Sequence, residues 1–320
     1  MKYAYYPGCS LERNAGAYHD SAMAVAGPLG IEFESIEDWN CCGASEYVAL
    51  ELLPAYSLIA RNLAIAERQP GPAHKLVAPC SMCFLNLSKV DHHMASVPAV
   101  ADNVNRALAA GGLRYDPGSV QVRHLLHVIT EDVGLEAVRA RVQRPLYGLR
   151  VAPYYGCLIV RPAYGEARDD PEYPTSMDEL VRALGATVVD YPMKAQCCGG
   201  HMTQISEPVA LEMIRRLLKN AADYSADAIV TLCPMCQLNL DAYQDAVNKH
   251  FGTDFRIPVL YFTQVMGLAF GHDAKTVGIG KEFVSANAAL AKIGVEPPEA
   301  PAKERASKDA LPMPGRPKEN

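Results

Sequence analysis

The sequence lacks an apolar run long enough to cross a bilayer. A membrane-spanning helix needs roughly 18 or more consecutive apolar residues, and the best candidate, residues 257–271, is shorter and contains Thr263 and Gln264. The N-terminal residues also lack the apolar stretch and the small-residue cleavage site of an export signal. We therefore expect a protein that is not inserted into a membrane and that stays in the cytoplasm.

Basic residues are also fewer than acidic residues. The 320 residues include 30 Lys and Arg against 36 Asp and Glu, a formal net charge of -6. Proteins that bind nucleic acid usually have the opposite sign or a dense basic patch. No Gly-rich dinucleotide fingerprint follows a predicted strand. These absences argue against nucleic acid as a partner and against a bound dinucleotide.

Cysteine, in contrast, is abundant and regularly arranged. In a reducing cytoplasm, ten cysteines are more often metal ligands or redox groups than structural disulfides. One five-cysteine pattern occurs twice: a single Cys, then Cys-Cys-Gly, then Cys-x-x-Cys. The first set is Cys9, Cys41, Cys42, Cys80 and Cys83, and the second set is Cys157, Cys197, Cys198, Cys233 and Cys236. Such a repeat, together with matching flanking residues, predicts an internal duplication.

The pattern of apolar residues predicts an α/β fold. Short apolar or β-branched runs indicate strands at residues 2–6, 75–78, 151–155, 187–190 and 228–232. Helical periodicity covers 46–67 and 207–223, and it continues along the chain from Cys83 and from Cys236. Alternating strands and helices favour two pseudo-symmetric, Rossmann-like α/β halves, with Cys9, Cys80, Cys157 and Cys233 at the carboxyl ends of parallel strands.

The same reasoning divides the chain into three parts. We expect a first cysteine-rich domain at residues 1–148 and a second at 149–295. Residues 296–320 are rich in proline and charge and poor in large apolar side chains. Because such a composition buries little apolar surface, we expect a flexible tail there.

The motifs indicate a metal or cluster site in each half. A Cys-x-x-Cys just after a strand lets two thiolates converge on a metal, in zinc sites and iron–sulfur sites alike. Adjacent side chains on a strand point to opposite faces, so the Cys-Cys pairs need a tight turn, for which Gly43 and Gly199 are suited. Tetrahedral zinc and a cubane cluster each take four thiolates. The fifth cysteine of each set is either a free reactive thiol or a ligand of a larger, less symmetric cluster. Structural zinc sites and disulfides are alternative interpretations of the same cysteines.

A few other residues invite a functional interpretation. His201, three residues after Cys198, could give a proton to a product thiolate, or it could be a loop histidine. The pairs His92 with His93 and His124 with His127 could bind a metal, or they could be a surface helix and a packed segment.

Two arginines and two methionines have a similar double interpretation. Arg13 and Arg161 each follow the first cysteine of a set by four residues, so they could meet an anionic substrate or form surface ion pairs. Met82 and Met235, inside the Cys-x-x-Cys loops, are expected to give apolar shielding.

The double motif, from Lys2 to about Gly271, resembles the B subunit of heterodisulfide reductase. Typical segments are Tyr-Tyr-Pro-Gly-Cys-Ser-Leu-Glu at 5–12 and Cys-Pro-Met-Cys-Gln-Leu-Asn-Leu at 233–240. The resemblance implies that each five-cysteine set binds one noncubane [4Fe-4S] cluster. It also implies that a disulfide is reduced, or dithiols are oxidised, between the two clusters, with no catalytic residue beyond the cluster ligands except the candidate His201.

Partners are implied as well. With all ten cysteines committed, electrons must come from elsewhere, and the resemblance implies a complex with a ferredoxin-like subunit, which carries two cubane clusters, and with a flavin-containing subunit. Similar double motifs occur in iron–sulfur subunits of flavin-dependent lactate, glycolate, glycerol-3-phosphate and succinate dehydrogenases. The alternative function is therefore a non-catalytic electron-transfer subunit of such an enzyme.

Overall fold

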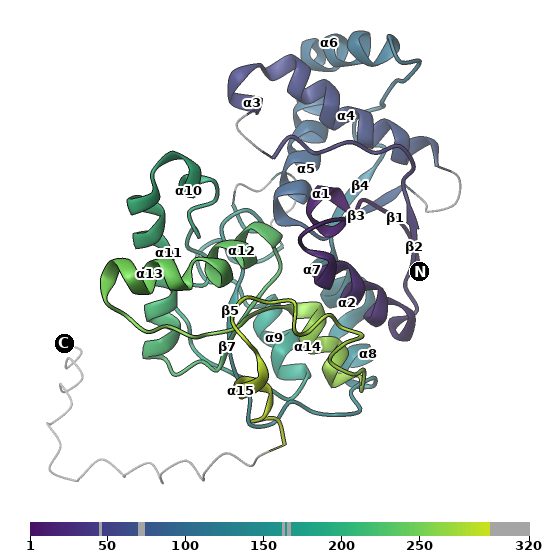
Figure 1. Ribbon diagram of the computed structural model, residues 1–320. Coiled ribbons are helices and arrows are strands. Elements are labelled where there is room, and N and C mark those ends of the chain that lie inside the picture. Colours follow the sequence, from purple (N-terminus) through teal and green to yellow (C-terminus); the bar gives the residue numbers. More distant parts are fainter. Residues whose placement is uncertain (45–46, 70–73, 162–163, 165–167, 295–320) are drawn as a thin grey trace, which may run out of the picture.

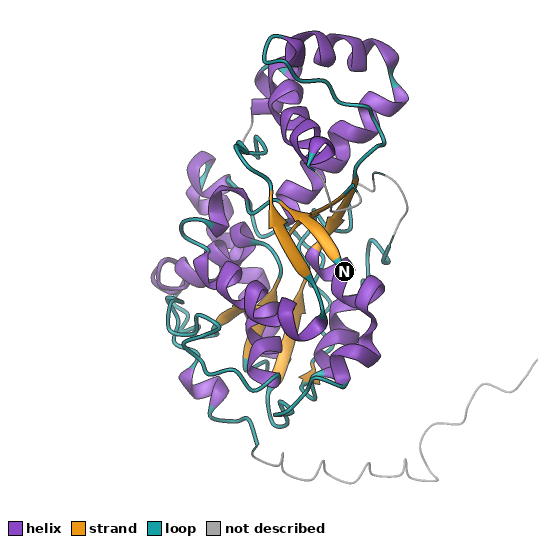
Figure 2. Ribbon diagram, turned by 90° about the vertical axis from the view of Figure 1, so that its right-hand side faces the viewer, coloured by secondary structure: helices purple, strands orange, loops and turns teal. Residues whose placement is uncertain are grey.

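The computed structural model describes residues 1–44, 47–69, 74–161, 164 and 168–294. Two four-stranded parallel sheets form its framework, in the orders β2-β1-β3-β4 and β6-β5-β7-β8 (Figures 1 and 2). The strands are β1 (Lys2–Tyr5), β2 (Glu32–Ser35), β3 (Lys75–Ala78), β4 (Gln121–His124), β5 (Arg150–Tyr154), β6 (Thr187–Val188), β7 (Ala228–Thr231) and β8 (Val259–Tyr261). Because each sheet repeats the strand order of the other, the predicted α/β class with two similar halves is confirmed.

Helices connect the strands and cover the sheets. In the first half these are α1 (Gly8–Leu11), α2 (Gly16–Ala26), α3 (Tyr47–Leu50), α4 (Leu52–Arg68), α5 (Ser81–Ser96), α6 (Pro98–Ala109), α7 (Leu125–His127) and α8 (Leu135–Arg139), with a 3-10 turn η1 (Gly27–Leu29) and a π-helical segment η2 (Val128–Gly134). In the second half they are α9 (Ser176–Ala183), α10 (Met202–Ile205), α11 (Glu207–Asp223), α12 (Pro234–Ala242), α13 (Gln244–Phe251), α14 (Phe262–Ala269) and α15 (Asn287–Leu290).

The central strands are buried and place the cysteines at one edge of each sheet. Residues of β3 and β7 such as Leu76, Val77, Ile229 and Val230 are fully buried, as in parallel strands covered by helices on both faces. The parallel register brings the carboxyl ends of β1 and β3 together, and likewise those of β5 and β7. The cysteines that follow these strands therefore gather at one edge of each sheet.

The predicted strands are found, although the segment at 187–190 forms a strand only over β6. Three strands, β2, β4 and β8, had no counterpart in the prediction. β2 and β4 alternate apolar with charged or polar residues, and β2, β4 and β8 all lie at sheet edges. Strand preference is weak where one side of a strand is not packed against a neighbour.

The predicted helix at 46–67 is wrong in its continuity. Glu46 lies outside the described residues, and the remainder forms two helices, α3 and α4, interrupted at Glu51 with φ -144° and ψ 112°. Pro54 explains the break, because a proline ring clashes with the carbonyl four residues earlier, here that of Leu50. The helix at 207–223 is confirmed as α11.

The two halves pack together along a contact between α2 and α14. The Ser21 and Thr263 hydroxyls are 2.6 Å apart across this contact. The chain after α14 also lies against α2, where a Cβ on Gly278 would stand 2.8 Å from Ala17. The halves are thus held in a defined relative position.

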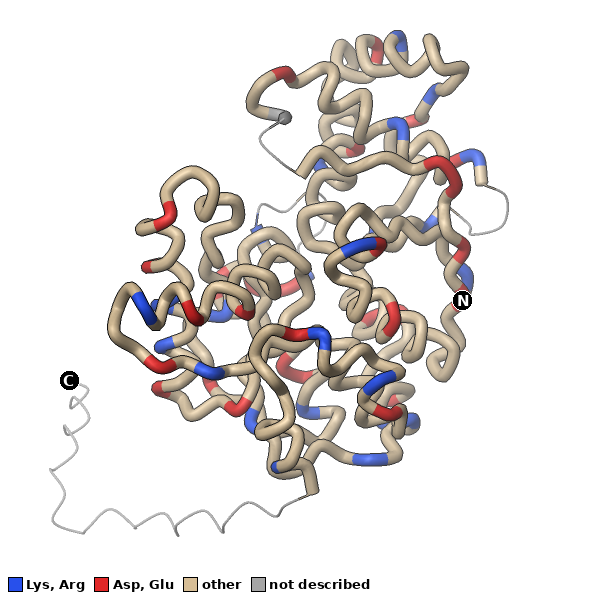
Figure 3. The backbone as a smooth tube through the Cα atoms, in the orientation of Figure 1, with Lys and Arg blue, Asp and Glu red and all other residues tan. Residues whose placement is uncertain are grey.

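Acidic and basic residues are interspersed along the described chain (Figure 3). No helix in the described ranges is long and apolar enough to cross a membrane. The predicted tail at 296–320 lies outside the described residues, and the boundary between domains at 148 and 149 stays a prediction.

Candidate metal centre

Each half gathers its five cysteines at the carboxyl edge of its sheet. All ten are free thiols. Cys80 and Cys233 are the residues that immediately precede α5 and α12, as the N-caps of these helices. The amino terminus of a helix carries partial positive charge from its free N–H groups, which favours thiolates there.

The first set forms a continuous chain of contacts. The sulfur atoms of Cys42 and Cys83 are 3.3 Å apart. Hydrogen bonds from Cys41 and Cys83 hold the pKa of Cys42 well below its usual value. The pKa of Cys41 is raised by its hydrogen bond with Cys42 and by burial, with a smaller effect of nearby Cys9. Contact with Cys42 and Cys80 raises the pKa of Cys83. All five predicted residues are therefore together.

The second set repeats this arrangement. A hydrogen bond from Cys157 lowers the pKa of Cys197 to about 6, and the same bond raises the pKa of Cys157, which also lies near Cys198. Hydrogen bonds with Cys198 and Cys233 raise the pKa of Cys236. Again all five predicted residues are brought together.

Each set has a buried part and an accessible part. Cys42, Cys80 and Cys83 are buried, whereas Cys9 and Cys41 are exposed. In the second set, Cys198, Cys233 and Cys236 are buried, Cys157 is half-buried and Cys197 is exposed. A group held by either set would thus be anchored in the protein and open on one side.

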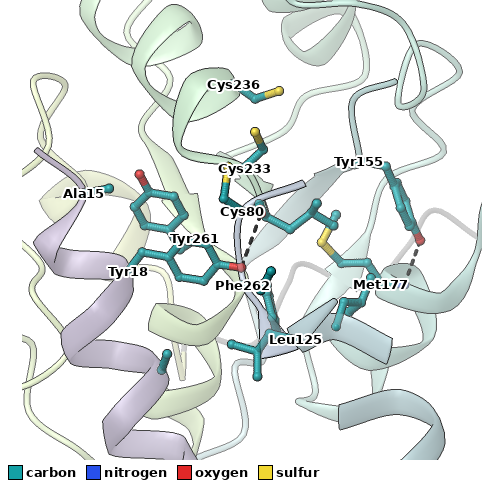
Figure 4. Packing of buried hydrophobic residues seen from close by; sticks show 14 of the residues in the cluster. Ala15, Tyr18, Cys80, Leu125, Tyr155, Met177, Cys233, Cys236, Tyr261 and Phe262 are labelled. Carbon is teal, nitrogen blue, oxygen red and sulfur yellow. Dashed lines mark hydrogen bonds between the residues drawn. The ribbon is translucent and has the colours of Figure 1, made fainter. Parts of the chain in front are cut away.

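The two sets also touch each other. A hydrogen bond between Cys80 and Cys233 is the largest cause of the raised pKa of Cys80. Bonds from Cys236 and Cys80 keep the pKa of Cys233 well below its usual value. Figure 4 shows Cys80 and Cys233 side by side, with Cys236 beyond them. The two sites therefore meet at the contact between the halves.

A glycine opens space beside the Cys-x-x-Cys motif in each half. Gly8 and Gly156 have φ of +69° and +68°, and a Cβ on either would stand 3.0 Å from the sulfur of Cys83 or Cys236, respectively. At this distance the sulfur would have to move to make room for the Cβ. A positive φ also costs conformational free energy in residues other than glycine. Only glycine leaves this space open next to the thiols.

Side chains from equivalent positions support the Cys-Cys turns in the two halves. The Asn86 amide donates to the Cys42 carbonyl at 3.0 Å. The Asn239 amide donates to the Cys198 carbonyl at 3.2 Å and to the Gly200 carbonyl at 2.9 Å. Sequence reasoning missed these residues as functional, although Leu-Asn-Leu follows both Cys-x-x-Cys motifs.

Two tyrosines anchor the residue that precedes each Cys-Cys pair. The Tyr6 hydroxyl donates to the Asn40 carbonyl, and the Tyr154 hydroxyl donates to the Gln196 carbonyl, both at 2.7 Å. The Tyr-x-Gly-Cys segment occurs in both halves, and this repeat could have indicated the anchoring role of the tyrosine. Each links the loop of the first cysteine to that of the next two.

The second set has an additional support. Lys194 is fully buried and donates to Asp178 at 2.8 Å, and the Tyr155 hydroxyl donates to the other oxygen of Asp178 at 2.6 Å. The Lys194 carbonyl accepts from the N–H groups of Tyr155 and Gly156 at 2.9 and 3.1 Å. This network joins the loop leading to Cys197 to the strand leading to Cys157.

The predicted histidines have different surroundings. His201 is half-buried just before α10. His92 is exposed, and His93 bonds the Tyr56 hydroxyl at 2.5 Å. His124 and His127 are both buried, with their ring centres 5.8 Å apart.

The arginines and methionines are mostly structural. Arg161 pairs with Glu172 at 2.8 Å and donates to the Ala195 carbonyl at 2.6 Å. Arg13 is exposed. Met82 and Met235 pack against the core.

The donor set fits an iron–sulfur group. Within the described ranges, no three His, Cys, Asp or Glu side chains form a ligand set for one metal ion. A cluster spreads its thiolate bonds over several iron atoms, so its ligands need not converge on one point. Crowded thiols such as Cys41 and Cys42, whose mutual hydrogen bond shifts their pKa values in opposite directions, lie beside a space that a Cβ would fill. Such thiols suit a cationic group that deprotonates them.

Comparison with known proteins places the chain in a family. The model of the cysteine-rich domain family, CCG, matches residues 3–88 and 151–241, more than half of the chain. The chain therefore belongs to this cysteine-rich family, and it carries the domain twice.

Relatives over nearly the whole chain narrow this further. The B subunit of the ferredoxin/F(420)H(2)-dependent CoB-CoM heterodisulfide reductase of Methanosarcina acetivorans is 30% identical over 91% of this chain and 97% of its own length. A protein of Archaeoglobus profundus, described as like the B subunit of heterodisulfide reductase, is 30% identical over 87% of this chain and 93% of its own. The 8-methylmenaquinol:fumarate reductase membrane anchor subunit of Wolinella succinogenes is 36% identical over 89% of this chain and 98% of its own. The predicted resemblance to the B subunit of heterodisulfide reductase is confirmed.

A solved structure shares the fold. A hypothetical protein from Helicobacter pylori matches with a TM-score of 0.70 at 14% identity, over 89% of this chain. The chain spans about half of that protein, 52% of its length. At this identity the likeness shows the fold alone.

Proposed function

We propose that this chain is the catalytic iron–sulfur subunit of a heterodisulfide reductase-like complex in the cytoplasm. Cys9, Cys41, Cys42, Cys80 and Cys83 would hold one noncubane [4Fe-4S] cluster, and Cys157, Cys197, Cys198, Cys233 and Cys236 the other. The observation that carries the proposal is that Cys80 of one complete five-thiol set lies beside Cys233 of the other (Figure 4).

The chemistry follows from this arrangement. When bound, the two clusters would supply one electron each to a disulfide, which takes up two electrons and two protons as its S–S bond breaks into two thiols. The chain's buried thiolates hold each group in place, and the exposed Cys9, Cys41 and Cys197 mark the side from which a substrate approaches. His201 is the candidate donor of a proton to a product thiolate.

Partner proteins would deliver the electrons, in this proposal a ferredoxin-like subunit together with a flavin-containing subunit. Exposed apolar side chains at equivalent places in the two halves support such contacts. Leu50, Leu52 and Leu53 are exposed after the first Cys-Cys-Gly, and Ile205 and Val209 after the second. Exposed apolar groups that lie close together commonly mark an interface.

The test is a reaction with disulfides under anaerobic conditions. The reduced protein is mixed with a series of low-molecular-weight disulfides, and the released thiols and the reoxidation of the protein are followed together. We expect two thiols per two electrons for at least one disulfide. Variants lacking one site, Cys42→Ser and Cys198→Ser, are expected to lose the reaction, whereas Gly30→Ala, outside both sites, serves as the control.

The Wolinella relative favours a second candidate, an electron-transfer subunit of a flavin-dependent fumarate reductase or dehydrogenase. In that case the bound groups only relay electrons. The reduced protein would then fail to cleave every disulfide and would still pass electrons between a flavin partner and an acceptor. That combination of results would replace the first proposal by the second.

A further inference from the structure

One buried hydroxyl touches both Cys-x-x-Cys turns. Tyr18, on α2, is completely buried. Its hydroxyl is 3.0 Å from the Pro79 carbonyl and 3.3 Å from the Leu232 carbonyl. Pro79 immediately precedes Cys80, and Leu232 immediately precedes Cys233. These two carbonyls hold equivalent positions in the two halves, so the hydroxyl proton is shared between the two sites.

The ring of Tyr18 is held firmly in place. It stacks on Tyr261 with ring centres 4.3 Å apart and an angle of 8° between the planes. Phe262 meets it edge-on at 6.0 Å. Figure 4 shows the Tyr18 hydroxyl pointing from this stack toward Cys80 and Cys233. The packing of the ring therefore fixes the position of the hydroxyl oxygen.

The ring of His124 also lies near the same two carbonyls. His124 is completely buried, and its Nδ1 accepts from the Leu126 N–H at 3.0 Å, which places the proton of the neutral ring on Nε2. Burial lowers the pKa of His124 to about 4, and this shift is opposed first by nearby Cys233 and then by the Pro79 and Leu232 carbonyls. Among the described residues, Nε2 has no hydrogen bond of ordinary geometry. In the part of the chain that the structure describes, the side-chain hydrogen bonds to these two carbonyls therefore come from the Tyr18 hydroxyl.

These contacts matter because two carbonyl oxygens repel when they approach. Without a donor between them, the turns before Cys80 and Cys233 would relax apart. The contact between the Cys80 and Cys233 thiols depends on the same spacing, because each thiol belongs to the residue after its carbonyl.

We propose that Tyr18 is a positioning residue that fixes the spacing of the two Cys-x-x-Cys turns and thereby couples the two metal sites electronically. This inference rests on the proposed function. The coupling falls steeply with distance, so a small separation of the turns weakens it while each site keeps its own ligands.

The variant Tyr18→Phe removes the hydroxyl and retains the ring. Tyr261→Phe is the matched control, since it removes a partly buried hydroxyl from the same stack, one that contacts Gln237 at 3.5 Å rather than the two carbonyls. Iron and sulfide are measured first, and then the magnetic interaction between the two reduced clusters by electron paramagnetic resonance. We expect Tyr18→Phe to keep its iron and sulfide and to lose much of the magnetic interaction, and Tyr261→Phe to match the wild type in both.

A cross-linking measurement separates the spacing from the clusters. The full chain is stripped of metal and treated with a short bifunctional thiol reagent, and the Cys80–Cys233 link is quantified by mass spectrometry relative to the Cys42–Cys83 link. We expect Tyr18→Phe to lower this ratio by about two- to tenfold, the equivalent of one hydrogen bond. If Tyr18→Phe folds poorly, amide hydrogen exchange in the wild-type chain tests the same claim. We expect the first turns of α5 and α12 to open together and therefore to exchange at similar rates.

The outcomes are distinct. Unchanged magnetic interaction and cross-linking in Tyr18→Phe would overturn the inference, as would an equal loss in Tyr261→Phe or independent opening of the two turns. A wild-type chain without iron and sulfide would instead contradict the proposed function. The cross-linking ratio would then still test whether Tyr18 fixes the spacing of the two turns.

Discussion

Gly8 lies directly against the sulfur of Cys83, so closely that a Cβ at position 8 would stand 3.0 Å from it. Gly156 stands in the same relationship to Cys236. The first cysteine of each set follows its glycine by one residue. This contact therefore joins the beginning and the end of each five-cysteine pattern, which are far apart in sequence.

Gly8→Ala should empty the first site. The added methyl meets Cys83 and imposes strain at φ +69°, so we expect the loss of about half of the bound iron, one of two four-iron groups. Gly30→Ala is the matched control, since Gly30 has the same φ of +69° and nothing within 4 Å of its added Cβ. The control should lose about 1–2 kcal/mol of stability and keep its iron. Equal iron contents in the two variants would contradict this account.

The asparagines should differ in importance. Asn239 holds two carbonyls of its turn and Asn86 holds one. We expect Asn239→Ala to cost about 1–3 kcal/mol, more than Asn86→Ala, because it leaves one buried and one partly buried carbonyl without this donor. Denaturant unfolding measures the difference, and iron release from each variant in the presence of a chelator should follow the same order. A larger effect of Asn86→Ala would show that the turns are held by other contacts.

Lys194→Met should be strongly destabilising. It leaves the buried carboxylate of Asp178 without its cation, a change worth about 3–5 kcal/mol in comparable pairs. The double variant Lys194→Met/Asp178→Asn should recover most of this loss, because the amide is neutral and can still accept from Tyr155. Thermal unfolding of the two variants measures the recovery. No recovery in the double variant would mean that the loss comes from the cation–π contact of Lys194 with Tyr173 rather than from the unpaired carboxylate of Asp178.

The buried Asp241 predicts a pH dependence. Burial raises the pKa of this carboxyl from 3.8 to about 6, more than offsetting the hydrogen bonds from Phe283, Val284 and Gln237. The folded state therefore binds a proton that the unfolded state has released, and the stability due to this proton declines as pH rises from about 4 to 6.

Asp241→Asn should remove that decline, which is at most about 3 kcal/mol for a shift of this size. Unfolding by urea at pH 4 and pH 7 should give a smaller difference in the variant than in the wild type. The same difference in both proteins would assign the pH dependence to other groups.

The sequence predicted the parts of the site that short-range patterns control. The spacing of the cysteines identified both sets, and apolar runs located the central strands, because a buried parallel strand must be apolar along its whole length. The edge strands β2 and β4 escaped notice because edge positions tolerate polar residues, and β8 escaped notice because its apolar run is only three residues long. The break at Glu51 could have been predicted from Pro54.

The contacts between distant segments could not be predicted from the sequence. Nothing near Tyr18 in the chain indicates that its hydroxyl meets residues 79 and 232, since this depends on how the halves pack. The same holds for Lys194, because a lone lysine in a loop is usually exposed. Asn86 and Asn239, in contrast, repeat within the duplication, and this repeat was a usable signal.

The central claim is that both five-cysteine sets hold iron–sulfur groups. It is tested most directly by measuring iron, acid-labile sulfide and zinc per chain in protein purified without oxygen. The account predicts about eight irons with matching sulfide, two four-iron clusters, and little zinc. Zinc bound without sulfide would contradict the account and would mean that the cysteines form structural zinc sites.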